Sequence, residues 1–409
     1  MRNLKLLEHK RVAIIGAGTS GLLCAIICAK SSSSAKKIDV AIYEQNPKPA
    51  KKILVSGNGR CNITNISTCQ EDYFSENPSF VKYALENFSF NEFEKFTSSI
   101  GLMLDVKEDG KVYPLSNEAK SVATLLENYA KSLGVIFHTE NKVTDIKKLL
   151  QEYDTVVVAT GSEAASHLGG NSDGQAFAKE FGHTIISTYP SLVQLHLNSN
   201  THAKMSGAKV DGEVTLLINN KVTSTCRGDI LFTEYGVSGF AVLDISQQAS
   251  EALMNFQSVD IVLNLLPKYT PQQLSAHIMK MAQLNPHANI LDILHGLVAL
   301  KIAKTVLDVL EIPHAKACLE VDTKLSKRIA NQILNWKFEV SDTHGFRHAE
   351  VSGGGVDTRE INPKTMESLK QKNLYFCGEV LDVVGRRGGF NFAWAWASAV
   401  CAAEDITKA

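Results

Sequence analysis

The sequence predicts an α/β protein in which a doubly wound parallel sheet is interrupted by a β-rich region, itself interrupted by a helical region. Three observations support this prediction. A short apolar strand, a helix and a second apolar strand occupy residues 11–43. After Pro190 the pattern changes to short segments of alternating hydrophobicity. A buried strand and an apolar helix return at 373–405, where they read as the last pieces of the first sheet.

Length and composition exclude several classes of protein. The chain has 409 residues, enough for two or three domains of about 150 residues each. Its 42 lysines and arginines balance 43 aspartates and glutamates, so no overall basic field attracts nucleic acid. The eight cysteines include no Cys-x-x-Cys pair and no zinc-ligand spacing. They favour free thiols in a reducing cytoplasm and no bound metal.

One apolar run, Val12–Ala29, is long enough to suggest a signal peptide. Glycines interrupt it at a specific spacing, and we interpret it as a buried strand that leads into a buried helix. No other stretch reaches the ~18 apolar residues of a membrane span. We therefore expect a cytoplasmic protein without membrane contact.

The first part of the chain alternates between apolar strands and helices. The predicted strands cover residues 11–15, 38–43, 135–138 and 153–159. The predicted helices cover residues 20–30, 78–100 and 116–134. The last of these strands has a continuous apolar run, Val156 to Ala159, as expected of a strand buried on both faces. A loop rich in lysine, glycine and asparagine separates the two halves of this part at residues 46–66.

The rest of the chain contains the β-rich and helical regions and then returns to α/β. The predicted strands cover residues 192–197, 213–218, 229–232, 259–265, 336–340, 346–351 and 373–377. The predicted helices lie near 239–250, within 267–335 and at 390–405. The predicted domains are a nucleotide-binding domain (1–190 and 357–409), a β-rich substrate-side domain (191–266 and 336–356) and a helical insertion (267–335).

A glycine-rich turn between the first strand and the first helix predicts a dinucleotide site. Gly16 permits the tight turn, Gly18 lets the backbone approach a pyrophosphate, and Gly21 lets the helix pack on the strand. The helix N-terminus offers free N–H groups to the phosphates. Glu44 ends the second strand 23 residues after Gly21, where a carboxylate accepts ribose hydroxyls and disfavours the 2′-phosphate of NADP. The alternative is a packing turn without a ligand.

Two later segments favour FAD over NAD. The strand at 153–159 ends in Ala159-Thr160-Gly161, an exit typical of flavoproteins with two dinucleotide domains. A second strand ends in Gly378-Glu379, which places an acid near the ribityl chain and pyrophosphate. The helix that begins at Gly388-Gly389 would then point its N-terminus at the flavin pyrimidine edge. We expect these two glycines to leave room for the ring.

The loop at Ser56–Asn65 leaves alternatives open. Gly57 and Gly59 permit close approach of the backbone to a ring or phosphate. Arg60 binds a pyrophosphate or substrate, or it pins a long loop. Cys61 is a redox thiol beside the flavin or, as the default, a small buried residue.

The motifs together resemble a known family, the bacterial BaiN-like NAD(P)/FAD-dependent oxidoreductases, also called aminoacetone oxidase family FAD-binding enzymes or YhiN-like flavoproteins. The most specific match is Lys52–Asn65, similar to the family's Ser-Gly-Gly-Gly-Arg-Cys-Asn stretch. Further matches include Gly353–Val356 and Gly378–Asp382. The resemblance implies an FAD domain interrupted by a β-rich domain and a nested helical domain.

This sequence departs from the family at four positions. Asn58 replaces the middle glycine of the triplet, and Arg387 stands where threonine is common. Glu234 and Phe240 stand where histidine and proline are usual. A role of the usual histidine therefore does not transfer, and the role of Glu234 stays open.

The predicted cofactor is non-covalent FAD, and no catalytic residue is assigned. The predicted cofactor-binding residues are Gly16, Ala17, Gly18, Ser20, Gly21, Glu44, Gln45, Lys52, Ser56, Gly57, Asn58, Gly59, Arg60, Cys61, Asn62, Val143, Ala159, Thr160, Gly161, Gly378, Glu379, Gly388, Gly389, Phe390 and Asn391. The substrate-side candidates are His344, Arg347 and His348, whereas His183 and His196 are expected in the core.

Three functions remain open at this stage. The first is a reductase of an enone-like small molecule that uses NAD(P)H as a transient reductant at flavin N5. No second Gly-x-Gly-x-x-Gly lies between 190 and 345, so the nicotinamide must visit the same flavin face as the substrate. The second is an amine oxidase that uses O₂. The third is a flavin-containing RNA-binding or RNA-modifying module, which the neutral charge disfavours but a local patch at Lys48, Lys51, Lys52 and Arg60 allows. The oligomeric state is not predicted.

Overall fold

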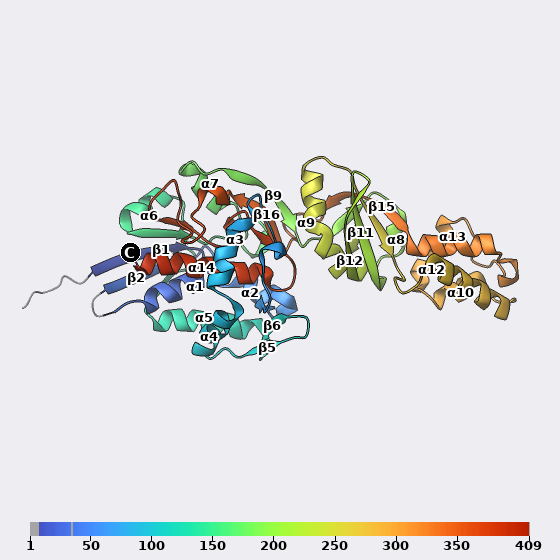
Figure 1. The fold of residues 1–409 in the computed structure, drawn as a ribbon, viewed down its shortest axis with the longest axis horizontal. Coiled ribbons are helices and arrows are strands. Elements are labelled where there is room, and N and C mark those ends of the chain that lie inside the picture. Colours follow the sequence, from blue (N-terminus) through green and yellow to red (C-terminus); the bar gives the residue numbers. More distant parts are fainter. Residues whose placement is uncertain (1–7, 34–35, 409) are drawn as a thin grey trace, which may run out of the picture. The chain divides into compact units, whose positions relative to one another are not determined.

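The computed structural model describes residues 8–33 and 36–408, which divide into two compact units (Figure 1). Unit 1 comprises the described residues up to Thr188 together with those from Val351 onward, and unit 2 comprises Tyr189–Glu350. Each unit has its own hydrophobic core. The predicted division of residues 191–356 into a β-rich domain and a helical insertion stays a prediction.

A five-stranded parallel sheet forms the centre of unit 1. Its strands, in spatial order, are β17 (Leu374–Phe376), β8 (Thr155–Val158), β1 (Glu8–Ile15), β2 (Lys36–Tyr43) and β7 (Ile136–His138). The middle of the sheet consists of valine, alanine and isoleucine side chains that are buried on both faces, as expected when helices cover the two sides. The predicted α/β class, with a returning last strand, is confirmed.

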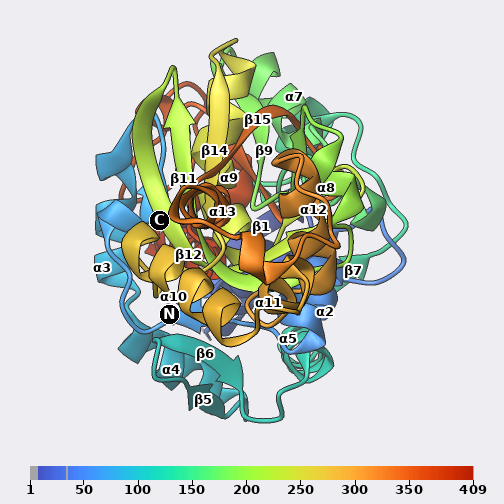
Figure 2. The same cartoon turned by 90° about the vertical axis from the view of Figure 1, so that its right-hand side faces the viewer.

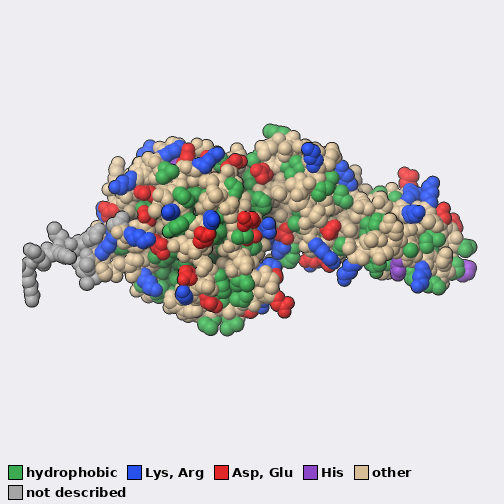
Figure 3. Space-filling view, in the orientation of Figure 1, with side chains coloured by type: hydrophobic (Ala, Val, Ile, Leu, Met, Phe, Trp, Pro, Cys, Tyr) green, Lys and Arg blue, Asp and Glu red, His purple; other side chains and the backbone are tan. Residues whose placement is uncertain are grey.

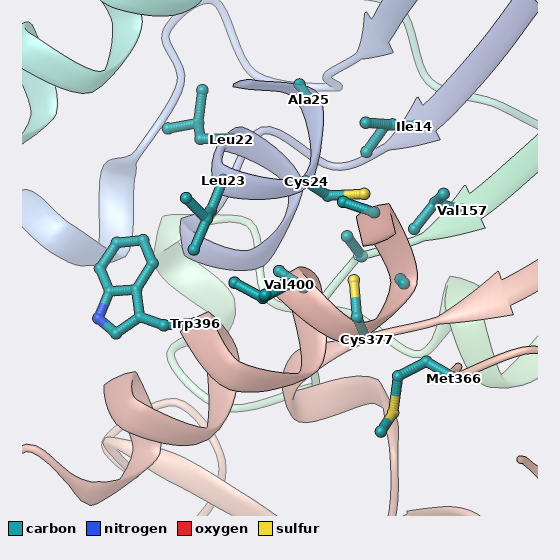
Figure 4. Packing of buried hydrophobic residues seen from close by; sticks show 14 of the residues in the cluster. Ile14, Leu22, Leu23, Cys24, Ala25, Val157, Met366, Cys377, Trp396 and Val400 are labelled. Carbon is teal, nitrogen blue, oxygen red and sulfur yellow. The ribbon is translucent and has the colours of Figure 1, made fainter. Parts of the chain in front are cut away.

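Helices of very different sequence position pack together beside this sheet. Helix α1 (Thr19–Lys30) packs against α14 (Phe390–Lys408) and against α5 (Ala119–Ser132). Leu23 on α1 and Trp396 on α14 belong to the resulting core (Figure 4). Helix α1 is apolar on almost every side. Without α14 a large part of its apolar surface would be exposed to water.

The remaining elements of unit 1 are short. The helices are α2 (Lys51–Val55), α3 (Val81–Asn87), α4 (Phe90–Ser99), α6 (Ile146–Glu152) and α7 (Asp173–Glu180). In a three-stranded sheet, β6 (Lys111–Pro114) lies between β3 (Thr64–Asn65) and β5 (Leu104–Val106). Two further sheets have two strands each: β4 (Tyr73–Phe74) pairs with β18 (Val384–Gly385), and β9 (Ile185–Ser191) pairs with β16 (Val351–Val356). The predicted helix at 78–100 breaks at Phe88 and Ser89, whose backbones are not helical, and the predicted loop at 46–66 contains α2.

Unit 2 contains a closed barrel and a group of helices. The barrel strands are β10 (Leu195–Leu197), β13 (Gly236–Ser238), β12 (Lys221–Phe232), β11 (Lys209–Ile218), β14 (Val259–Asn264) and β15 (Trp336–Thr343). Buried and less buried residues alternate along β11 and β14, which places one face of each strand in the core. Helices α8 (Thr201–Lys204) and α9 (Phe240–Met254) accompany the barrel.

Four helices lie between the last two barrel strands in the sequence (Figures 1 and 2). They are α10 (Pro271–Leu284), α11 (Ile290–His295), α12 (Leu300–Val309) and α13 (Thr323–Leu334). Thr270 starts α10 with a capping box and Pro271 occupies its first turn, both strong helix-start signals. The predicted strand at 346–351 is wrong for residues 346–350, because the N–H groups of His348 and Ala349 bond back to Gly345 in a turn.

Candidate functional site

The glycine-rich turn after β1 has two glycines that packing requires and one that it does not. A Cβ on Gly16 would lie 2.4 Å from the carbonyl oxygen of Ala159, and a Cβ on Gly21 would lie 1.9 Å from that of Gly16. A Cβ on Gly18 would meet no atom within 4 Å. Gly18 therefore has no packing reason to be glycine, whereas backbone approach to a ligand requires it.

The N-terminus of α1 is open to an anion. Gly18 is its N-cap residue, no side chain caps the helix, and its first turn contains no acid. Its free N–H groups and the helix dipole favour a phosphate at this end. Ser20 and Ala17, two other predicted cofactor-binding residues, are buried on either side of Gly18.

The carboxylate of Glu44 lies beside this turn and is buried. Its Oε2 accepts a hydrogen bond from the N–H of Ala17 (2.9 Å), and its Oε1 accepts bonds from the backbone and side-chain amides of Asn46 (2.8 and 2.7 Å). These donors fix the carboxylate and leave one lone pair, on Oε2, for a ribose hydroxyl. The amide of the adjacent Gln45 donates instead to the carbonyl oxygen of Gly169 (2.7 Å).

Residues from four distant segments meet near Glu379. Its Oε2 pairs with Nζ of Lys52 at 3.1 Å, and its Oε1 accepts a bond from the N–H of Ser352 (2.9 Å). A Cβ on Gly161 would lie 3.8 Å from Oε2 of Glu379. The strand exits at 159–161 and 378–379 therefore converge, as the sequence predicts. Val143 packs against the edge of the core of unit 1.

The loop at Ser56–Asn62 is held by its own backbone. Gly57, Asn58 and Cys61 have left-handed backbones, and the N–H of Cys61 donates to the carbonyl oxygen of Ser56 (3.0 Å). The exposed guanidinium of Arg60 lies over the ring of Tyr113, 5.5 Å from its centroid.

One polar atom of this loop is left without a partner. The side-chain oxygen of Asn62 is buried and accepts no hydrogen bond from any described residue. This buried acceptor beside a glycine-rich loop is compatible with a hydrogen bond from a ligand or from an ordered water.

Cys61 is a buried structural residue. Its side chain is fully buried, and burial raises the pKa of the thiol to about 11. The thiolate fraction at pH 8 is then about one in a thousand, too small for a reactive redox thiol. We expect iodoacetamide at pH 8 to leave the Cys61 peptide unlabelled in the folded protein and to label it after unfolding, as measured by mass spectrometry. Rapid labelling of the folded protein would support the redox alternative.

The start of α14 corrects one expectation. A Cβ on Gly389 would lie 2.2 Å from the carbonyl oxygen of Thr64, and the side chain of Asn65 donates to the carbonyl oxygen of Gly388 (3.1 Å). The room at Gly389 is therefore occupied by backbone, not left for a ring.

The other two predicted residues of this helix hold the strand before it. The amide of Asn391 exchanges two hydrogen bonds with the backbone of Gly385, both 2.8 Å. The carbonyl oxygen of Phe390 accepts a bond from the hydroxyl of Tyr73 (3.0 Å). Both residues fix the first turn of α14 within unit 1.

Asp382 is a buried carboxyl group near this site to which the sequence assigns no role. It lies four residues after Gly378, and its side chain is almost completely buried. Burial raises the pKa of its carboxyl group to about 6. Asp382 is the last residue of the Gly378–Asp382 motif, in which the sequence predicts a role only for the first two residues.

The histidine candidates of unit 2 form a cluster. Nε2 of His196 lies 2.8 Å from Nδ1 of His344, and the ring of His344 stacks on Tyr235 and contacts His348, with centroids 4.1 Å apart in both pairs. His196 is half-buried rather than a core residue. Glu234 is exposed, and its carbonyl oxygen accepts a bond from His202 (3.1 Å).

The residues of unit 1 fit a dinucleotide with an adenosine half and a pyrophosphate. The fit rests on the open cradle at Gly18, the uncapped helix start, the fixed carboxylate of Glu44 and the orphaned acceptor of Asn62. These features lie on separate segments that the fold of unit 1 assembles.

Comparison with known proteins identifies the family. The profile of the HI0933-like protein Rossmann domain matches residues 10–405. A 3-dehydro-bile acid delta(4,6)-reductase of Clostridium scindens is 32% identical and aligns with 97% of this chain and 99% of its own length. Ribosomal RNA dihydrouridine synthases of Haemophilus influenzae and Escherichia coli are 32% and 29% identical, each over 98% of this chain and 99% of its own. The chain therefore belongs to the HI0933-like Rossmann-domain family, which confirms the resemblance and the oxidoreductase class that its motifs predict.

Proposed function

We propose that this chain is an FAD-dependent reductase that adds a hydride to a carbon–carbon double bond conjugated to a carbonyl group, with NAD(P)H as the reductant. The observation that carries the cofactor is the open, uncapped start of α1 beside the buried carboxylate of Glu44. The relatives support the reaction, because a delta(4,6)-reductase and a dihydrouridine synthase both have names that describe saturation of such a bond.

The chain's residues would divide the binding of FAD between them. The N–H groups at the start of α1 would bind the pyrophosphate, and Glu44 would accept a hydroxyl of the adenosine ribose. The Lys52–Glu379 pair and the side chain of Asn62 would bind polar groups nearer the flavin. Non-covalent FAD, once reduced by NAD(P)H, would supply the hydride that the substrate receives, and a proton from solvent would complete the saturated bond. A second nucleotide domain is not predicted, so NAD(P)H and substrate would use the flavin in turn.

The cofactor is tested on the purified protein. We expect a yellow protein that releases FAD and not FMN on denaturation, because the turn at Gly16–Gly21 and the carboxylate of Glu44 suit the adenosine half. Mixing with NADH or NADPH without oxygen should then bleach the flavin absorbance at 450 nm. A colourless protein that rejects added FAD would contradict the cofactor, and rapid O₂ consumption with amines but no bleaching would favour the amine oxidase alternative.

A second candidate, reduction of uridine in ribosomal RNA, is supported by the two dihydrouridine synthases among the relatives. The surface argues against it, because basic and acidic side chains are mixed over the face drawn in Figure 3. Lys52 of the basic patch is also paired with Glu379.

The two substrates are separated by reoxidation of the reduced protein. We would offer either a 3-oxo-4,6-diene steroid or unmodified ribosomal RNA and follow the flavin absorbance. Fast reoxidation by the steroid alone supports the small-molecule reductase. Fast reoxidation by RNA, with dihydrouridine detected by mass spectrometry of the digested RNA and retention that weakens with salt, supports the second candidate.

A further inference from the structure

The carboxyl group of Asp382 joins three segments of unit 1. Its Oδ2 accepts a hydrogen bond from the N–H of Glu76 (2.8 Å) and one from the hydroxyl of Ser75 (3.2 Å). Its own backbone N–H donates to the carbonyl oxygen of Val356 (3.0 Å). Asp382 thereby links the end of β4, the end of β16 and the segment that leads from Gly378 into β18.

Strands β4 and β18, which lie next to the hydrogen bonds of Asp382 in the sequence, contact the first turn of α14. Strand β4 pairs antiparallel with β18, and Tyr73 lies opposite Gly385. The hydroxyl of Tyr73 bonds the carbonyl oxygen of Phe390, and the amide of Asn391 bonds both backbone groups of Gly385. A change in how firmly the end of β4 is held is therefore passed to the start of α14 through hydrogen bonds that are all within unit 1.

The charges around Asp382 make its ionisation costly. Burial is the largest cause of the raised pKa, and the carboxylates of Glu76 and Asp357 raise it further. Arg359, whose charge interacts with this group, is engaged with Asp357 through two guanidinium nitrogens (2.8 and 2.6 Å). The donors at Ser75 and Glu76 lower the pKa but do not outweigh burial. The group therefore changes its charge near pH 6, within the ordinary working range of a protein.

We propose that Asp382 is a positioning residue for the start of α14, the helix N-terminus that the sequence leads us to expect at the flavin pyrimidine edge, so the inference rests on the proposed function. The ionised carboxylate accepts stronger hydrogen bonds from Ser75 and Glu76 than the neutral acid does, because one partner is then charged. Ionisation tightens the end of β4, the β4–β18 pair and the first turn of α14. Protonation loosens the same series of contacts. A buried carboxyl with a perturbed pKa is a recurrent sign of a functional role.

The first test records the visible absorbance of the FAD-loaded protein between pH 5 and pH 8. In the unchanged protein we expect a shift of the flavin bands with a midpoint near pH 6. Asp382→Asn should abolish this transition, because the amide does not ionise. Glu76→Gln should keep the transition and move its midpoint to lower pH, because it removes one neighbouring negative charge. Asp109→Asn, a change in an exposed carboxylate paired with Lys111, should leave the midpoint unchanged.

The second test does not need FAD. Two of the three tryptophans, Trp394 and Trp396, lie near the start of α14, and Trp336 lies in unit 2. In a Trp336→Phe background, fluorescence should therefore show the same transition near pH 6, and Asp382→Asn should abolish it. If the protein binds no FAD but shows this transition, the proposed function is wrong and the positioning of α14 by Asp382 still stands. A flat titration of both signals in the unchanged protein, or the same midpoint in Asp382→Asn, would overturn the proposal.

Discussion

Replacement of Gly18 by valine is expected to abolish retention of FAD while the protein still folds. The backbone of Gly18 is extended, with φ −79° and ψ −167°, and valine accepts this conformation easily. A Cβ there meets no protein atom, so the new side chain fills only the space in front of the helix N-terminus. Each lost hydrogen bond to a charged phosphate is worth about 1.5–3 kcal/mol, and the loss of two weakens binding by roughly 100-fold or more.

The measurement is the ratio of flavin to protein after gel filtration, with circular dichroism as the test of folding. Gly21→Ala is the matched control, because its Cβ would lie 1.9 Å from the carbonyl oxygen of Gly16 and would disrupt the turn itself. We expect the control to lose both folding and flavin, whereas Gly18→Val loses only the flavin. A normal flavin content in Gly18→Val would show that the turn is a packing feature without a ligand.

Replacement of Gly389 by alanine is expected to destabilise unit 1 severely. Gly389 has a φ of +96°, and its Cβ would lie 2.2 Å from the carbonyl oxygen of Thr64. The left-handed backbone costs about 1–2 kcal/mol and the displacement of packed backbone about 1–3 kcal/mol more. The free energy of unfolding in urea should therefore fall by roughly 2–5 kcal/mol.

Gly182 provides the control for this prediction. Its φ is +79°, so alanine pays a similar backbone cost, but its Cβ would meet no atom within 4 Å. Gly182→Ala should therefore lower the free energy of unfolding by only about 1–2 kcal/mol. Equal losses in the two variants would mean that Thr64 moves aside without cost, and the start of α14 would then be less firmly held than the contacts indicate.

The sequence predicted the parts of the site that depend on local spacing. The turn at Gly16–Gly21 and the acid at Glu44 follow from a strand, a helix and a second strand in immediate succession. It could not predict that Gly389 packs against Thr64, because that contact joins segments more than 300 residues apart. The sequence also could not predict that the side chain of Asn391 hydrogen-bonds to the backbone of Gly385. An asparagine at the start of a helix is compatible with binding either a ligand or a neighbouring loop.

Secondary structure shows the same limit. The helix predicted at 78–100 has continuous apolar periodicity, yet the chain turns at Phe88, where the ring packs edge-on against Phe93. Residues 346–350 of the strand predicted at 346–351 instead form a turn, in which the N–H groups of His348 and Ala349 donate to the carbonyl oxygen of Gly345. In both places tertiary contacts outweigh a short local pattern, which is the least reliable level of a sequence argument.

The division of unit 1 between two separated stretches of sequence has a consequence for the nascent chain. Strand β17 and helix α14 leave the ribosome after the whole of Tyr189–Glu350, although they complete the sheet begun by β1. Until then one edge of β8 is unpaired and the side of α1 that packs against α14 is exposed, although α5 already covers another side, and partly made domains aggregate in such a state. The continuous segment Tyr189–Glu350 carries its own core and is free to fold first. The surroundings of Gly18 in unit 1 are therefore complete only after β17 and α14 have been translated. Chaperones thus have more time to bind unit 1, which is proposed to take up the cofactor, than to bind unit 2.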